Sequence, residues 1–166
     1  MLRILRFSAP VFVAVVLTSC GSDQENPFAP GIDGNPPPTI SAEVVTLVDL
    51  VNVHRVSEGC SPLAWHEGAA AVADAHSTDM RDRDFFSHTN PDGKSPFDRM
   101  RDAGVEWSGA AGENIAWGTS SGQMAFDMWI NSSGHRANIE NCSFTHHGVG
   151  LVDARWTHLF LQNPAE

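Results

Sequence analysis

Histidine and acidic side chains in three polar segments are the residues of this chain that could carry chemistry. His88 follows two phenylalanines, Glu113 lies in the segment AGENIA, and His135 lies in the segment SSGHR. Neutral imidazoles suit Zn²⁺, and a nearby carboxylate can orient a water molecule or accept its proton. These segments lie far apart in the sequence, so their spacing alone does not show that the three side chains meet.

The same residues also have a structural interpretation. Glu113 could accept backbone hydrogen bonds and fix a loop, with His88 and His135 as a buried pair beside it. His76 falls on the apolar face of an expected helix and is interpreted as a core histidine. The histidines on the expected strands are placed at the surface: His146, His147 and His158. All five tryptophans are expected in the core: Trp65, Trp107, Trp117, Trp129 and Trp156.

Helical and strand periodicities indicate the elements that must position these residues. Apolar spacing, capping residues and breakers predict helices over 41–58, 67–83, 96–103 and 123–132. A new turn or short helix that carries His135 is expected from Gly134. Alternation near the C-terminus predicts a hairpin that turns at Asp153 and Ala154. Helices first and strands last indicate an α+β domain with helices packed on an antiparallel sheet.

The N-terminal segment has the pattern of an export signal rather than of a folded element. Arg3 and Arg6 precede a short apolar run, and the run ends in LTSC at residues 17–20. This tetrapeptide resembles the bacterial lipobox, in which the cysteine is acylated and becomes the new N-terminus. We therefore expect a lipoprotein signal peptide over 1–19, a Gly- and Pro-rich tether over 20–40, and one folded domain over 41–166. The alternative is an ordinary signal peptide.

Charge and cysteine content narrow the partners and the compartment. Without residues 1–19 the chain has eight basic and twenty acidic residues, a formal charge of −12, which argues against nucleic acid as a partner. Lipidated Cys20 would attach the exported protein to the membrane of the cell envelope. Cys60 and Cys142 then remain as a pair, and an oxidising compartment favours a disulfide between them over two free thiols.

Several motifs in a fixed order resemble the CAP superfamily of cysteine-rich secretory, antigen 5 and pathogenesis-related proteins, in its bacterial SCP-domain branch. The motifs run from residue 85 to residue 150: FFSH (85–88), PDG (91–93), GENIA (112–116), SGHRANI (133–139) and GVG (148–150). The resemblance covers about residues 43–163. It implies an α-β-α sandwich, a small antiparallel sheet flanked by helices.

The resemblance also implies a cleft of two histidines and two glutamates, which binds a divalent metal such as zinc in some members. Matching motifs assign His88, Glu113 and His135 to this cleft, with His88 and His135 as possible metal ligands. The second glutamate falls near Ser132, where this chain has no carboxylate. We therefore favour a non-enzymatic module for an unknown protein or lipid ligand. The alternative is a metal-assisted, protease-like hydrolase that uses Glu113 as its catalytic base.

Overall fold

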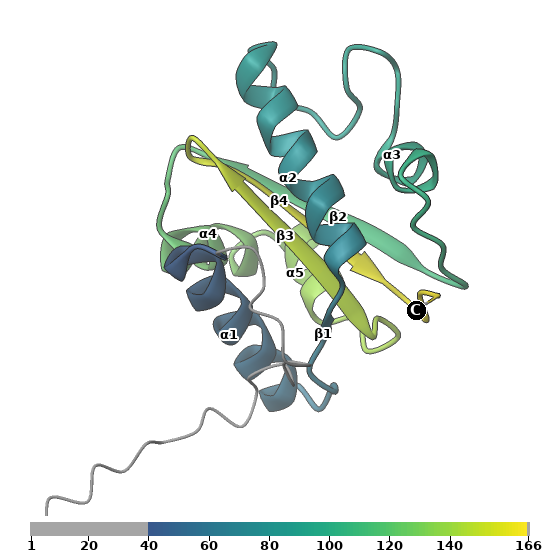
Figure 1. The fold of residues 1–166 in the computed structure, drawn as a ribbon. Helices are drawn as coiled ribbons and strands as arrows, with labels where there is room; N and C mark the ends of the chain where they lie inside the picture. The colour runs from purple at the N-terminus through teal and green to yellow at the C-terminus, as the bar shows by residue number, and fades with distance from the viewer. Residues whose placement is uncertain (1–39, 166) are drawn as a thin grey trace, which may run out of the picture.

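A four-stranded sheet lies between two layers of helices in the computed structural model, which describes residues 40–165 (Figure 1). This arrangement confirms the α+β class and the expected α-β-α sandwich. The signal peptide expected over 1–19, the expected acylation site at Cys20 and nearly all of the expected tether fall outside the described residues. Within 40–165, no helix is long and apolar enough to cross a membrane.

The helices begin and end close to where the sequence predicts. They are α1 (Ala42–Ser57), α2 (Glu67–Asp82), α3 (Pro96–Asp102), α4 (Gly122–Ile130) and α5 (Ser133–Ile139). Ser41 caps α1 by accepting a hydrogen bond from the backbone N–H of Val44, and Ser95 and Asp98 form a capping box on α3. The predicted helix over 123–132 ends earlier, at Ile130, and a separate short helix carries His135.

The strands form one sheet in the order β1-β3-β4-β2. They are β1 (Ala64–Trp65), β2 (Ala111–Trp117), β3 (His146–Val152) and β4 (Arg155–Leu161). The predicted hairpin is confirmed as β3 and β4, and both turn residues, Asp153 and Ala154, have positive φ. Local sequence patterns did not predict β1 or β2. Strand β2 pairs antiparallel with β4 and places Glu113 opposite Leu159.

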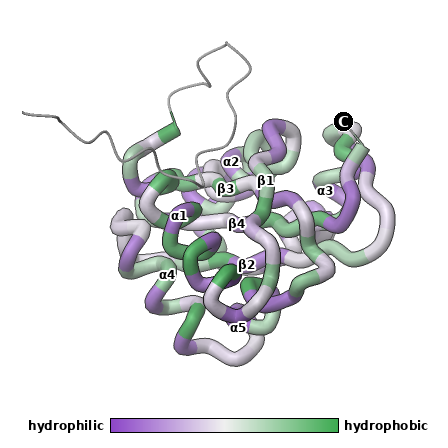
Figure 2. The backbone as a smooth tube through the Cα atoms, turned by 90° about the horizontal axis from the view of Figure 1, so that it is seen from below, coloured by the Kyte–Doolittle hydropathy of each residue, from purple (hydrophilic) through white to green (hydrophobic). Residues whose placement is uncertain are grey.

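Each face of the sheet is covered by its own helices. Helix α2 lies across one face with α3 beside it, whereas α1, α4 and α5 cover the other face (Figure 1). Helices α1 and α4 also lie side by side in the perpendicular view of Figure 2. The backbone of α2 approaches β3 at Gly148 and Gly150, where a Cβ atom would lie 2.1 and 2.2 Å from backbone nitrogens of α2. Glycine is therefore required on this face of β3.

The predictions of which histidines are exposed and which tryptophans are buried were each wrong in part. His147 and His158 are fully buried on the face toward α1 and α4, because neighbouring strands bring their rings together. Their Nδ1 and Nε2 atoms are 3.0 Å apart, so one imidazole donates to the other. Trp129 and Trp156 are in the core as expected, but Trp117 is 51 % exposed at the end of the edge strand β2.

The predicted disulfide between Cys60 and Cys142 is present. It joins the segment after α1 to the segment before β3. Arg55, which is fully buried, holds the same region together by donating hydrogen bonds to the carbonyl groups of Ser61, Ile139 and Phe144. A covalent bond and a buried guanidinium thus fix the C-terminal end of α1 against the loops that flank β3.

Candidate functional site

His88 and Glu113 meet at the edge of the sheet. The segment after α2 brings His88 to β2, where Glu113 points toward the face covered by α2 and α3, as does its partner Leu159 on β4. His88 Nδ1 lies 2.7 Å from Glu113 Oε1. The carboxylate accepts the Nδ1 proton in this arrangement, so a neutral His88 ring keeps a lone pair on Nε2.

Arg99 completes the pair from α3. Its Nη2 donates to Glu113 Oε2 at 2.5 Å, and its Nη1 donates to the backbone carbonyl of His88 at 2.7 Å. The side chains of Arg99 and Glu113 are only 10 % and 2 % exposed. Both oxygens of the carboxylate are therefore engaged and shielded from solvent, while the His88 side chain remains half exposed.

Helix α5 places His135 beside these residues. Burial lowers the pKa of the His135 imidazole, and the nearby charge of His88 lowers it further. His135 Nδ1 is buried and has no hydrogen-bond partner within residues 40–165. The structure therefore brings His88 and Glu113 into contact and holds His135 on the helix that is attached to β2 next to Glu113, and the lowered pKa favours the neutral form of His135.

Two asparagines attach α5 to β2 and so fix the position of His135. Asn114 Nδ2 donates to the backbone carbonyl of His135 at 3.0 Å. Asn138 Nδ2 lies 3.2 Å from the carbonyl oxygen of Glu113 and 2.8 Å from Asn114 Oδ1. Both asparagines belong to the motifs that carry Glu113 and His135, so motif membership was the signal that could have found them.

Ser132 precedes α5 and has no carboxylate to add to His88, Glu113 and His135. Among residues 40–165, no group of three or more His, Cys, Asp or Glu side chains is arranged to hold a metal ion. His88 and His135 are two imidazoles, whereas catalytic zinc sites have three protein ligands as a rule. Glu113 is already held by Arg99 and His88. The donor set therefore does not fit a four-residue metal centre, and the arrangement instead presents an oriented imidazole at the surface.

His76 lies where the sequence predicts, whereas Arg99 is a site residue that the sequence does not reveal. His76 is a core histidine as predicted, 1 % exposed, with Nε2 3.0 Å from the carbonyl oxygen of Ser87. Arg99 was not predicted as a site residue, because the local pattern of α3 gives no sign that one of its two arginines is buried. Only the contact between α3 and β2 reveals it.

Comparison with known proteins identifies relatives of this fold. The model of the family described as "CAP: Cysteine-rich secretory protein family" matches residues 48–162. The Bacillus subtilis proteins YkwD and YlbC, both described as uncharacterized, are 41 % and 39 % identical over 75 % and 70 % of this chain. These alignments cover 49 % and 33 % of the relatives, so the chain spans half or less of their length.

Solved structures show the same architecture. An extracellular protein containing an SCP domain from Bacillus anthracis matches 72 % of this chain and 40 % of its own, with 39 % identity and a TM-score of 0.69. An outer surface protein from Borrelia burgdorferi matches 73 % of this chain and 92 % of its own, with a TM-score of 0.66. The latter pair is 16 % identical, so that likeness concerns the fold.

Proposed function

Because this chain belongs to the cysteine-rich secretory protein (CAP) family, in its bacterial SCP branch, we propose that it is an exported binding module of the cell envelope. Its cleft of His88, Glu113 and His135 contacts a protein or lipid ligand. The observation that carries this proposal is the state of Glu113, whose two oxygens are held by Arg99 and His88 away from solvent. A carboxylate held in this way orients His88 and, at 2 % side-chain exposure, is closed to a solvent water that it would have to activate.

The lipid anchor is the second part of the proposal. The lipobox-like LTSC at residues 17–20 supports acylation of Cys20, and the Gly- and Pro-rich tether would hold the domain away from the membrane. The related Bacillus anthracis protein, which is described as extracellular, agrees with export. A Cys20→Ser variant is expected to leave the membrane fraction. If this variant stayed with the membrane, the anchor would be ruled out.

The competing function is a metal-assisted hydrolase with zinc on His88 and His135 and Glu113 as the base. Ser132 at the place of the second family glutamate and the engagement of Glu113 by Arg99 both argue against it. Two imidazoles alone predict weak zinc binding.

Calorimetry with zinc chloride on the purified protein separates the two functions. The binding module predicts weak zinc binding, with Kd about 1 mM, and no cleavage of a mixed peptide library. Micromolar zinc binding and peptide cleavage that are both lost in His88→Ala and Glu113→Ala would establish the hydrolase instead. A His66→Ala variant, which changes a histidine at the start of α2, is the control.

A photo-crosslinking amino acid tests the ligand directly in cells. Placed at position 88, at the rim of the cleft, it is expected to give one discrete crosslinked product. Placed at Thr46, an exposed position on α1 in the opposite helical layer, it is expected to give none. Equal products from both positions would contradict a ligand at the cleft.

A further inference from the structure

Two exposed aromatic rings extend the surface around His88. Phe86 and Trp117 are 45 % and 51 % exposed, and their ring centroids are 6.1 Å apart. Phe86 comes from the segment after α2, two residues before His88, and Trp117 ends β2, four residues after Glu113. Contact of two adjoining rings with water is unfavourable, so a partner that covers them would gain free energy.

Two carboxylates beside these rings share one guanidinium. Arg155 lies opposite Trp117 in the sheet, and its Cζ atom is 4.9 Å from the centroid of the indole ring. Its Nη2 is 3.7 Å from Asp84 Oδ1, and its Nη1 is 3.2 Å from Asp153 Oδ2. Both aspartates are exposed, whereas the Arg155 side chain is nearly buried. We call Phe86, Trp117, Asp84 and Asp153 the aromatic-acidic surface.

The fold gathers this surface at one end of the sheet. Asp153 lies in the turn between β3 and β4, and the end of β2 is next to that turn, where the N–H of Gly118 donates to the carbonyl of Ala154 at 3.0 Å (Figure 1). The segment after α2 adds Asp84 and Phe86. Three parts of the chain that are distant in sequence therefore supply the four residues.

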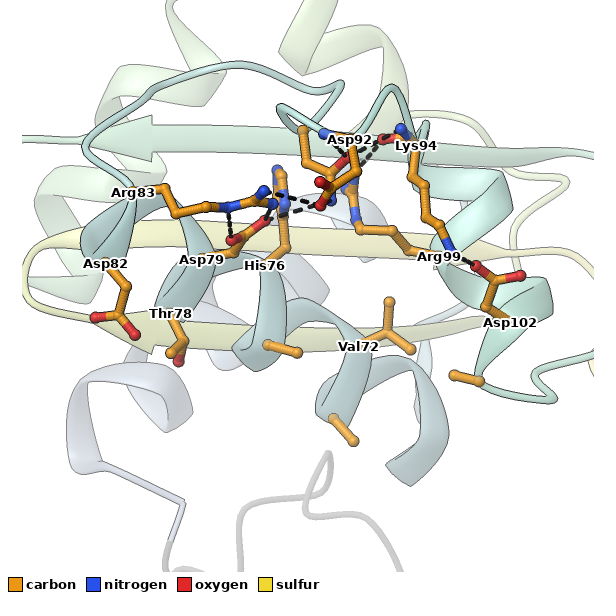
Figure 3. A pocket seen from close by; sticks show the side chains of 14 residues that line it. Val72, His76, Thr78, Asp79, Asp82, Arg83, Asp92, Lys94, Arg99 and Asp102 are labelled. Carbon is orange, nitrogen blue, oxygen red and sulfur yellow. Dashed lines mark hydrogen bonds and ion pairs between the residues drawn. The ribbon is translucent and has the colours of Figure 1, made fainter.

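The groove between α2 and α3 has acidic residues but differs from this surface in two ways (Figure 3). No phenylalanine, tyrosine or tryptophan lines it. Its Arg83 is held at N···O distances of 2.5 and 2.8 Å by Asp79 and Asp92, so both carboxylates are engaged. Asp84, in contrast, is too far from Arg155 for a hydrogen bond and can accept one from a partner.

Side chains are the recognition elements that the edge strand β2 offers. Trp129 Nε1 donates to the carbonyl of Ile115 at 3.0 Å, and Asn138 Nδ2 lies 3.2 Å from the carbonyl oxygen of Glu113. A partner strand that added to β2 would find both carbonyl groups engaged. The exposed rings and carboxylates at the end of β2 have no such restriction.

We propose that the aromatic-acidic surface binds an arginine in a basic segment of a protein, and that this protein is the ligand of the His88 cleft. A guanidinium is flat and charged, so it can stack on the Phe86 ring and donate to Asp84 at the same time. Trp117 then covers the methylene groups of the arginine or an apolar neighbour of it. The inference rests on the proposed function, since it names the chemistry of the ligand that the cleft contacts.

Charge supports a basic partner and disfavours two other occupants. One guanidinium faces two carboxylates here, and the chain without residues 1–19 has a formal charge of −12. A second copy of this chain would be repelled by the same charge. An anionic membrane surface would be repelled as well.

NMR titration of the isotope-labelled, purified protein with a short peptide of alternating arginine and leucine tests the proposal. Saturable shifts are expected at the Trp117 indole N–H and at the backbone amides of Asp84 and Phe86, with Kd about 1 mM or lower. A matched peptide has citrulline, which is neutral and nearly isosteric, in place of arginine. It should bind about fivefold more weakly. Binding of the arginine peptide should also weaken as the salt concentration rises.

Three variants assign the contacts. Trp117→Ala should weaken binding of the arginine peptide about tenfold. Asp84→Asn changes an exposed side chain, and should weaken binding about threefold and reduce its dependence on salt. Met128→Ala, a change of an equally exposed apolar residue on α4 in the opposite helical layer, should leave binding unchanged. Thermal unfolding compares the folding of Trp117→Ala with that of Met128→Ala.

The proposal is overturned by the absence of saturable shifts, or by equal binding of the citrulline peptide. Unchanged binding in both Trp117→Ala and Asp84→Asn would overturn it as well. Loss of the same signals on phosphatidylcholine vesicles, with no response to the peptide, would make the surface a lipid-headgroup site instead. A crosslinked product at position 88 without peptide binding would reject this inference alone, whereas peptide binding without that product would reject the function assigned to the cleft.

Discussion

Arg99 and Glu113 illustrate how much of this site depends on a single ion pair. Both side chains are largely removed from solvent, and Glu113 accepts from Arg99 and His88 at the same time. Removing one partner of a buried pair leaves the other charge without compensation, which costs far more than loss of a surface pair. Arg99 therefore stabilises the domain and also fixes the orientation of His88.

We expect Arg99→Met to lower the free energy of unfolding by about 3 kcal/mol, measured by urea denaturation at pH 7. Arg101→Met is the matched control, because Arg101 lies on the same helix but is exposed and paired with an exposed Asp98. It should change stability little. A double variant that also carries Glu113→Leu should regain part of the loss. Equal effects of the two arginine substitutions would show that the buried pair is unimportant.

The contact between α2 and β3 depends on backbone approach rather than on side-chain interlocking. Ala69 and Ala70 on the helix face Gly148 on the strand, and a Cβ atom at position 148 would lie 2.1 Å from the nitrogen of Ala70. Neither backbone can move without separating the helix from the sheet. The same close approach holds α2 against the sheet, with His76 buried on this helix.

A Gly148→Ala substitution should therefore lower the free energy of unfolding by at least about 3 kcal/mol, because the added methyl group overlaps main-chain atoms. Chemical denaturation measures the change. Gly134→Ala is the control, since a Cβ atom at this helical position meets no described atom within 4 Å. It should raise stability by about 0.5–1 kcal/mol. A mild effect at position 148 would mean that α2 can shift away from the sheet.

The whole domain carries a pair of neutral histidines in its core, which makes its stability depend on pH. Burial lowers the pKa of His147 to about 3 and that of His158 well below its ordinary value of 6.5. The unfolded chain binds protons at these residues below pH 6.5, whereas the folded domain does not. Stability is therefore fully present above pH 6.5 and is lost as the pH falls from there toward 3.

We expect the free energy of unfolding to fall by roughly 1.4 kcal/mol per pH unit for each of the two histidines between pH 6 and 5. Urea denaturation at several pH values measures this slope. His147→Leu should reduce this slope by roughly 1.4 kcal/mol per pH unit, because the chain then takes up one proton fewer on unfolding. Val149→Ala, a buried change on the same face of β3, should lower stability without altering the slope. An unchanged slope in His147→Leu would contradict the claim that His147 takes up a proton when the domain unfolds.

Local sequence features predicted most elements and part of the site. Helical periodicity and caps located α1 to α3, and alternation around the Asp153-Ala154 turn located β3 and β4, because these signals act between near neighbours in the chain. Ordered motifs assigned His88, Glu113 and His135 to one cleft. They also marked Ser132 as the place where a carboxylate is absent.

Contacts between distant parts of the chain determined the strand β2 and the burial of the charged and histidine side chains. Strand β2 was not predicted, because its segment depends on pairing with β4, whose partner residues lie 38 to 50 positions further along the chain. The burial of Arg99, His147 and His158 likewise follows from which elements lie against them. The order of residues determined which side chains were available for chemistry. Tertiary structure decided that Glu113 is held by Arg99 and leaves His88 as the exposed group, because only packing of α3 against β2 removes both charges from solvent.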